Sequence, residues 1–193
     1  MDLAISNWIF NTFGKSKFFA VLSKIVTYFG EWWGICLMVA LLLCFKKTRK
    51  IGLYAGVACL LGYCFNNLFL KILVQRERPF VKHEEFKQMS ALAGYMLPDG
   101  YSLASGHSVA TMAFATSVLL QSKKAGMFAV PLMALVGISR VCLLVHFATD
   151  VLVGWCIGIL FACVAFCLLN YLNELYLKKR GVNDEKNNLG NKK

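Results

Sequence analysis

A small set of ionisable side chains lies within or beside long apolar runs of this 193-residue chain, where charged groups are costly and are usually paired or functional. The set comprises Lys71, Arg78, His107, Arg140, His146 and Asp150, and Ser105 and Gly106 directly precede the first of these histidines. Guanidinium groups match phosphate oxygens in pairs of hydrogen bonds, and free amides at a helix start also favour an anion. Histidine can serve as nucleophile or as general acid near neutral pH. The set predicts phosphoryl transfer through a histidine nucleophile.

The order of His146 and Asp150 supports this prediction. They are four residues apart, so on a continuous helix both side chains lie on the same face. A carboxylate in that position orients the imidazole and stabilises its charged form, as in a catalytic triad. We therefore expect Asp150 to be the partner of His146.

The segments that carry these residues have the composition of a membrane protein. Hydrophobic residues make up 58% of the chain and charged residues 16%, with a mean hydropathy of +0.59. Soluble domains have about a quarter charged residues, so an intrinsically disordered chain is excluded and a soluble one is strongly disfavoured. A membrane-spanning helix needs about 20 mostly apolar residues. The segments that meet this requirement are 31–45, 51–74, 104–121, 125–146 and 149–177, with 16–30 as a shorter sixth that contains Lys24.

Basic residues predict the orientation of these spans. The formal net charge is +11, and the basic clusters fall on one side of the predicted map: residues 46–50, 123–124 and 178–180. The positive-inside rule assigns that side to the cytoplasm, so the loop Gln75–Ser102 and the junction His146–Thr149 face outward. We expect one transmembrane domain, residues 1–177, and a basic, disordered cytoplasmic tail, residues 178–193. Nucleic acid is not an expected partner, because the basic residues flank spans.

Three motifs resemble those of the type 2 phosphatidic acid phosphatase superfamily, a group related to histidine acid phosphatases and vanadium haloperoxidases. Residues 71–79, K-I-L-V-Q-R-E-R-P, resemble K-x6-R-P; residues 105–107 resemble most of P-S-G-H; and residues 139–150 match S-R-x5-H-x3-D. The motifs occur in the order of the family, and the resemblance covers approximately residues 50–175. It implies an all-α membrane bundle of six transmembrane helices with a phosphatase/haloperoxidase-like core.

The resemblance also implies a role for each residue. His146 attacks phosphorus, His107 protonates the leaving oxygen, and Asp150 holds His146. The phosphoryl oxygens are bound by Lys71, Arg78, Ser105, the Gly106 amide and Arg140. Neither a metal nor another cofactor is needed in that scheme.

One position departs from the family pattern, since Ala104 stands where the family has proline. Proline at a first helical position fixes φ without losing a hydrogen bond. We expect alanine to loosen this turn by about 1 kcal/mol, with no catalytic atom lost.

The combined prediction is a metal-independent lipid phosphate or pyrophosphate phosphatase in the plasma membrane, with its site on the extracytoplasmic side. Undecaprenyl pyrophosphate is the first substrate expected from the resemblance, followed by phosphatidylglycerol phosphate and phosphatidic acid; lipid A phosphates are less favoured. The oligomeric state stays open.

Simpler interpretations exist for the single residues. Lys71 and Arg78 could extend to lipid headgroups, and Ser105 could be an ordinary helix cap. Arg76 belongs to a polar loop that we expect to be solvated, although it could also contact a second phosphate. A non-catalytic lipid carrier or anion-binding subunit on the same fold is the alternative from another class. The presence of two histidines counts against it, because such a protein needs neither.

Overall fold

The computed structural model describes residues 1–190, and over that range the chain is helical, without a β-strand. The elements are α1 (Asp2–Phe13), α2 (Lys17–Tyr28), α3 (Trp32–Cys44), α4 (Arg49–Phe65), a π-helical turn (Asn66–Leu70), α5 (Lys71–Val74), α6 (Pro79–Lys82), a 3-10 turn (Glu84–Phe86), α7 (Lys87–Ala93), α8 (Gly106–Gln121), α9 (Lys123–Cys142) and α10 (Ala148–Gly190). Each apolar segment predicted from the sequence is helical over most of its length, which confirms the all-α class.

Helix α8 is the centre of the bundle and packs against α4, α9 and α10. Nearly every residue from Ser108 to Val118 is buried. Two glycines of α10 allow the close approach that this requires: a Cβ on Gly158 would lie 2.6 Å from the Val109 carbonyl oxygen, and one on Gly154 would lie 2.8 Å from the Ser108 side chain. Small residues at helix contacts are typical of membrane bundles, where packing drives association.

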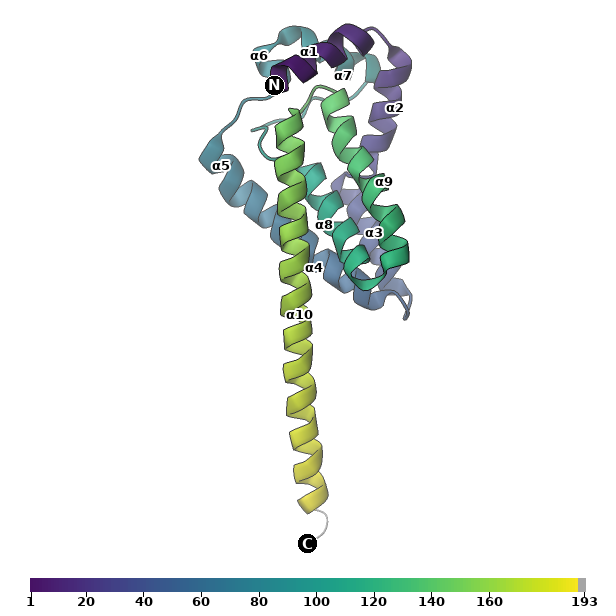
Figure 1. Ribbon diagram of the computed structural model, residues 1–193, viewed down its shortest axis with the longest axis vertical. Coiled ribbons are helices and arrows are strands. Elements are labelled where there is room, and N and C mark those ends of the chain that lie inside the picture. The colour runs from purple at the N-terminus through teal and green to yellow at the C-terminus, as the bar shows by residue number, and fades with distance from the viewer. Residues whose placement is uncertain (191–193) are drawn as a thin grey trace.

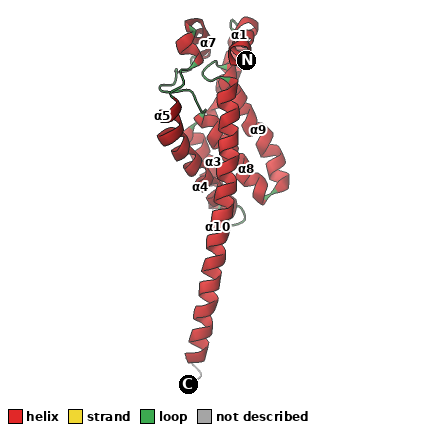
Figure 2. Cartoon of the chain, turned by 60° about the vertical axis from the view of Figure 1, so that its left-hand side comes forward, coloured by secondary structure: helices red, strands yellow, loops and turns green. Residues whose placement is uncertain are grey.

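The two ends of the bundle differ in chemistry. In Figure 1 the α3–α4 loop, the α8–α9 turn and the C-terminal part of α10 point to one end, and these segments carry the basic clusters. The α9–α10 junction lies at the other end. There α1 crosses the bundle above α9 and α10, and α6 and α7 lie beside α1. The view in Figure 2 shows the same division, with α10 continuing alone beyond the other helices.

Fewer helices than predicted have the length and apolarity to cross a membrane. Three segments qualify, Arg49–Lys82, Lys123–Cys142 and Ala148–Arg180, and α2 with α3 can form a fourth as a pair bent by 45°. The predicted count of six is not confirmed. The reason is length: α2, α3 and α8 have 12, 13 and 16 residues, whereas about 20 are needed to cross lipid. Hydropathy did not reveal that α2 and α3 follow one another as one bent unit.

Two helices end beside a residue in the left-handed conformation: α5 ends at the predicted residue Val74, whereas α9 ends at Cys142, four residues before the predicted end at 146. Gln75 (φ 48°) ends α5 and Leu144 (φ 57°) follows the end of α9. L-residues rarely adopt this conformation inside a helix, so the chain leaves the helical path there. Arg78 therefore lies outside the helix that carries Lys71, in the predicted outer loop.

Helix α10 continues to Gly190 along the described residues. The expectation of a basic, disordered tail over residues 178–193 stays a prediction, and residues 191–193 lie outside the described residues.

Candidate active site

Arg78 and His146 meet at the outer end of the bundle. Arg78, the residue before α6, is 4% exposed, and its Nη1 lies 3.1 Å from Nε2 of His146, which is 2% exposed. Backbone carbonyl oxygens hold the rest of the guanidinium group: Nη1 donates to Val145 at 3.0 Å, Nε to Gly100 at 2.9 Å and Nη2 to Asp99 at 3.1 Å. Arg78 is therefore fixed against the imidazole from several segments.

This contact determines the tautomer of His146. A guanidinium group can donate hydrogen bonds and cannot accept them, so Nε2 must present its lone pair and the ring proton is on Nδ1. His146 lies in the turn between the candidate spans, which end at Cys142 and begin again at Ala148. Burial lowers the pKa of His146, and nearby arginines act in the same direction, so the neutral imidazole is favoured. A neutral ring that carries its lone pair on Nε2 is the form that a nucleophile requires.

Asp150 lies behind His146, with its Oδ2 3.6 Å from Nδ1. The expected helical i,i+4 geometry is wrong, because His146 precedes the first residue of α10. The carboxylate is fully buried and is fixed from three directions: Oδ2 accepts from the Ser102 hydroxyl and from the Phe147 amide at 2.8 Å, and Oδ1 accepts from Arg76 Nη1 at 2.6 Å. Nδ1 itself lies 3.3 Å from the Ser102 hydroxyl oxygen, so Asp150 faces the Nδ1–H side of the ring directly and also acts on it through Ser102.

Arg140 occupies a second buried position, 1% exposed, near the end of α9. Its Nη1 donates to the Thr27 hydroxyl at 3.0 Å and to the Tyr95 hydroxyl at 2.6 Å, whereas its Nε has no hydrogen-bond partner in the described part of the chain. A buried donor without a partner costs about 1–3 kcal/mol. The Nε–H group of Arg140 can therefore donate a hydrogen bond to a bound ligand. Residues 141–145 connect this arginine to His146, and the His146 amide donates to the Arg140 carbonyl at 3.3 Å.

His107 has a carboxylate neighbour that the sequence reasoning missed. Its Nε2 lies 3.2 Å from Oε1 of Glu31, which stands in the break between α2 and α3. The same oxygen accepts from the Tyr95 hydroxyl at 3.2 Å. Burial raises the pKa of Tyr95, so its hydroxyl keeps the proton that it donates. Glu31 is an acidic residue between two apolar segments. Ionisable residues within or beside apolar runs are usually paired or functional, and this criterion would also have selected Glu31.

Ser105 begins α8 as predicted. Its Oγ accepts from the Ser108 amide at 3.4 Å, and its own amide donates to the Asp150 carbonyl at 3.1 Å, which ties the start of α8 to the start of α10. Gly106 follows as the first helical residue.

The turn before this helix start has a support of its own. The amide of Ala104 donates to Oδ1 of Asn66 at 3.2 Å, and its carbonyl accepts from Nδ2 of the same side chain at 3.2 Å. Asn66 is fully buried and begins the π-helical turn, a distortion often found at functional sites. A proline at position 104 lacks the amide hydrogen that Asn66 accepts.

Lys71 is the predicted site residue with the weakest structural connection. It begins α5, is partly exposed and makes no side-chain hydrogen bond or ion pair within residues 1–190. Arg76, by contrast, makes more contacts than the sequence predicts. It forms ion pairs with Asp150 at 2.6 Å and with Asp2 at 2.7 Å, so it is not a freely solvated loop residue.

Arg78 and Arg140 form no ion pair with a carboxylate of the described residues. An uncompensated buried charge is strongly unfavourable, and phosphate is a ligand that guanidinium groups suit. The arrangement can therefore accept an anion beside Nε2 of His146.

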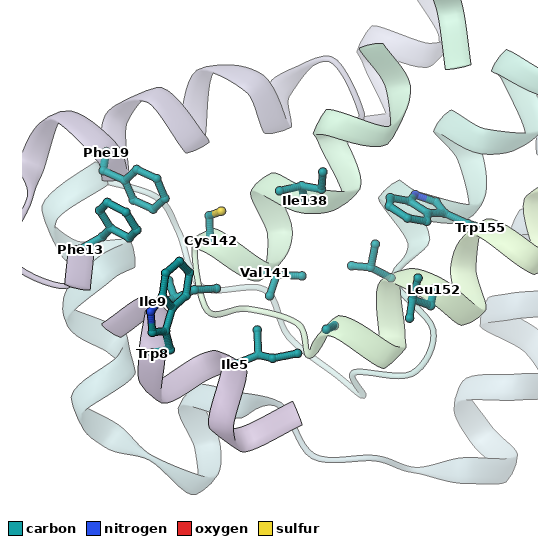
Figure 3. A pocket seen from close by; sticks show the side chains of 12 residues that line it. Ile5, Trp8, Ile9, Phe13, Phe19, Ile138, Val141, Cys142, Leu152 and Trp155 are labelled. Atoms are coloured by element: carbon teal, nitrogen blue, oxygen red, sulfur yellow. The ribbon is translucent and has the colours of Figure 1, made fainter. Parts of the chain in front are cut away.

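An apolar cavity of about 450 Å³ lies between α1, α2, α9 and α10, on the same junction but apart from these charges. Figure 3 shows Trp8 and Phe13 of α1, Phe19 of α2 and Trp155 of α10 around it. No charged side chain lines it. Its apolar lining suits hydrocarbon rather than a phosphate.

The chain is similar to several known proteins. The profile of the PAP2 superfamily matches residues 51–174. An undecaprenyl-diphosphatase of Sulfolobus acidocaldarius is 33% identical over 125 residues, which cover 63% of this chain but 56% of that protein. The undecaprenyl-diphosphatase BcrC of Bacillus subtilis is 26% identical over 157 residues, covering 79% of this chain and 78% of that protein. The crystal structure of a PAP2-type phosphatidylglycerolphosphate phosphatase from Bacillus subtilis has the same fold, with a TM-score of 0.68, 23% identity and coverage of 88% and 85%.

Proposed function

The chain belongs to the PAP2 superfamily, and we propose that it is a membrane lipid phosphatase that works through a phosphohistidine at the outer end of the bundle. The observation that carries this proposal is the pair of buried guanidinium groups, Arg78 and Arg140, which form no ion pair with an acidic side chain in the part of the chain that the structure describes. An anionic group that enters beside His146 would supply the missing charge.

In the proposed reaction, the phosphoryl group of the substrate takes over the hydrogen bond from Arg78 Nη1, which frees Nε2 of His146. The Nε2 lone pair then forms the bond to phosphorus while the bond from phosphorus to the leaving oxygen breaks. Asp150 stabilises the ring as it becomes positively charged. Charge on the transferring group is spread over its equatorial oxygens, where fixed donors act most strongly.

His107 supplies the proton for the leaving oxygen in this scheme, and the carboxylate of Glu31, 3.2 Å from its Nε2, stabilises the protonated ring. A water molecule then attacks the phosphohistidine, gives its proton to His107 and releases inorganic phosphate, which returns both histidines to their starting forms. Arg140, Lys71, Ser105 and the Gly106 amide complete the proposed set of phosphate contacts.

For the substrate, we propose undecaprenyl pyrophosphate first. Two undecaprenyl-diphosphatases are among the relatives, and the apolar cavity beside the α9–α10 junction suits an amphiphile with a long chain. Phosphatidylglycerol phosphate and phosphatidic acid are the alternatives. These lipids share a charged headgroup, which the arginines beside His146 would hold, and a hydrocarbon chain, which the apolar cavity would hold.

We also propose that the site faces the extracytoplasmic side of the plasma membrane, because the basic clusters lie at the opposite end of the bundle. Six crossings would need α2 and α3 to cross separately. Their 45° bend and their lengths favour one crossing made by both.

The test is phosphate release by the purified, detergent-solubilised protein in EDTA, with the three lipids offered in parallel and His146→Ala as the matched variant. We expect release that persists in EDTA and disappears in the variant. Loss of release in EDTA would contradict the metal-independent mechanism. Equal release by the variant would contradict the histidine mechanism, and no release by folded wild-type protein would favour the non-catalytic alternative.

A further inference from the structure

Arg76 lies between two carboxylates that come from distant parts of the chain. Its Nη2 is 2.7 Å from Oδ2 of Asp2, at the start of α1, and its Nη1 is 2.6 Å from Oδ1 of Asp150, in the first turn of α10. The side chain of Asp150 is fully buried, whereas that of Arg76 is 27% exposed. The guanidinium fork therefore ties the buried carboxylate to the N-terminal helix.

Arg76 also contacts the residues that surround this carboxylate. Its Cζ lies 4.3 Å from the ring centre of Phe147, the residue after the proposed nucleophile, and its Nη1 donates to the Thr149 hydroxyl at 2.6 Å. Its backbone carbonyl accepts from the Ser102 amide at 2.7 Å, and the hydroxyl of Ser102 donates to Asp150. One residue thus supports Asp150 on both of its oxygens, directly on Oδ1 and through Ser102 on Oδ2.

Asp2 keeps this arginine in place and completes the start of α10. Its carboxylate accepts from the Thr149 amide at 3.2 Å and from the Thr149 hydroxyl, so a residue of α1 caps a helix 147 positions further along the chain. A negative charge at a helix start is favourable, because the first amides have no partner within the helix. Burial raises the pKa of Asp2, but hydrogen bonds from Thr149 and Arg76 outweigh it and the net pKa is lowered.

We propose that Arg76, held by Asp2, is a positioning residue that fixes Asp150 against His146, so that the N-terminal helix α1 supports the reaction. This inference rests on the proposed phosphatase function. Without Arg76, Oδ1 of a fully buried carboxylate loses its cation, and a buried charge without its partner rearranges or takes up a proton. Either change removes the support that the imidazole needs when it becomes charged during attack on phosphorus.

The test compares full-length, detergent-purified Arg76→Gln, Arg76→Lys, Asp2→Asn and the double variant Asp2→Asn/Arg76→Gln on the lipid that the wild type hydrolyses best. We expect Arg76→Gln to lower kcat by about 10–100-fold, with KM within about threefold of wild type. A loss of this size is typical when a residue that orients a metal ligand from the outer shell is removed, and Arg76 orients Asp150 in the same way. Arg76→Lys keeps the charge but cannot bridge two carboxylates, so it recovers part of kcat. Asp2→Asn lowers kcat less, and it adds little in the double variant, because Asp2 acts through Arg76.

Arg180→Gln, an exposed arginine at the opposite end of the molecule, is the matched control and keeps wild-type kcat. Thermal unfolding of each variant separates a loss of fold from a loss of positioning. If Arg76→Gln does not fold, Asp2→Asn tests the same bridge at a partly exposed residue. Wild-type kcat in Arg76→Gln or in Asp2→Asn, beside an active wild type and an inactive His146→Ala, would overturn this inference alone. Inactivity of the wild type on every lipid would contradict the proposed function and this inference with it.

Discussion

Replacing Arg140 by methionine removes a buried guanidinium group that has two hydroxyl partners and no carboxylate partner. The variant loses the hydrogen bonds from Nη1 to Thr27 and Tyr95, each worth about 1.5–3 kcal/mol for a charged donor. The variant no longer has the cost of burying a cation, which is several kcal/mol, or the cost of the unpaired Nε–H donor, which is about 1–3 kcal/mol. Methionine fills a similar length of space and adapts to irregular packing. These effects oppose one another, so we expect the stability of Arg140→Met to lie within about 2 kcal/mol of wild type.

Function should respond in a different way. Loss of one fixed donor to a developing anion lowers kcat by about 10²–10³-fold, so phosphate release should fall by that factor while the fold persists. Inorganic phosphate at about 100 times its dissociation constant stabilises a protein that binds it by about 2.7 kcal/mol. Wild type should therefore unfold at a higher temperature when phosphate is added, and Arg140→Met should lose most of that increase.

The assay is thermal unfolding of the detergent-purified full chain, with and without phosphate, beside phosphate release from the preferred lipid. Arg180→Met, at an exposed arginine of the other end, controls for the loss of a positive charge and should keep both the phosphate response and the activity. A strong fall in the unfolding temperature of Arg140→Met, together with an unchanged phosphate response, would refute the reasoning. Arg140 would then be a structural cation whose hydroxyl partners are sufficient for it.

Three further predictions concern residues that hold the site together. Glu31→Gln keeps an acceptor for Tyr95 but removes the charge 3.2 Å from His107, so it should slow lipid hydrolysis about tenfold or more. An aryl phosphate with an acidic leaving group needs less protonation and should be slowed much less; equal slowing of both substrates would argue against this role. Asn66→Leu leaves the buried amide and carbonyl of Ala104 unpaired, and thermal unfolding should report a loss of about 2–4 kcal/mol. The pKa of Asp2 is lower in the folded protein than its unfolded value of 3.8. The stabilisation from its ionised carboxylate is therefore fully present at a pH above the unfolded pKa and is lost as the pH falls through the folded pKa. The stability difference between wild type and Asp2→Asn should accordingly be constant near neutral pH and vanish in acid, and a difference that persists in acid would contradict the ion pair.

Much of the fold could be predicted because its signals are local. Apolar segments become helices in lipid, since the backbone must satisfy its own hydrogen bonds there, and each predicted segment contains a helix of the structure. Ser105 caps α8 as its position before an apolar run indicates. The count of spans was less predictable, because hydropathy averages over the break at Gly30 that turns α2 and α3 into one bent pair.

The candidate site could be predicted in part. The proximity of Arg78, His146 and Asp150 agrees with the sequence prediction, although their roles in catalysis stay proposals. Glu31 and Arg76 were not recognised as partners of His107 and Asp150. Each pair is separated by more than 70 positions, and no spacing rule connects residues so far apart.

The sequence by itself determined which segments are helical, where the basic loops gather and which side chains could handle a phosphate, because hydropathy and motif spacing are properties of neighbouring residues. Tertiary structure alone decided where Leu144 interrupts the predicted helix 125–146, since a left-handed backbone is stable only where the surrounding packing supports it. It also decided that two buried arginines remain without acidic partners while Arg76 joins Asp2 to Asp150. Those pairings depend on the approach of segments from opposite ends of the chain, which is a consequence of how the helices pack.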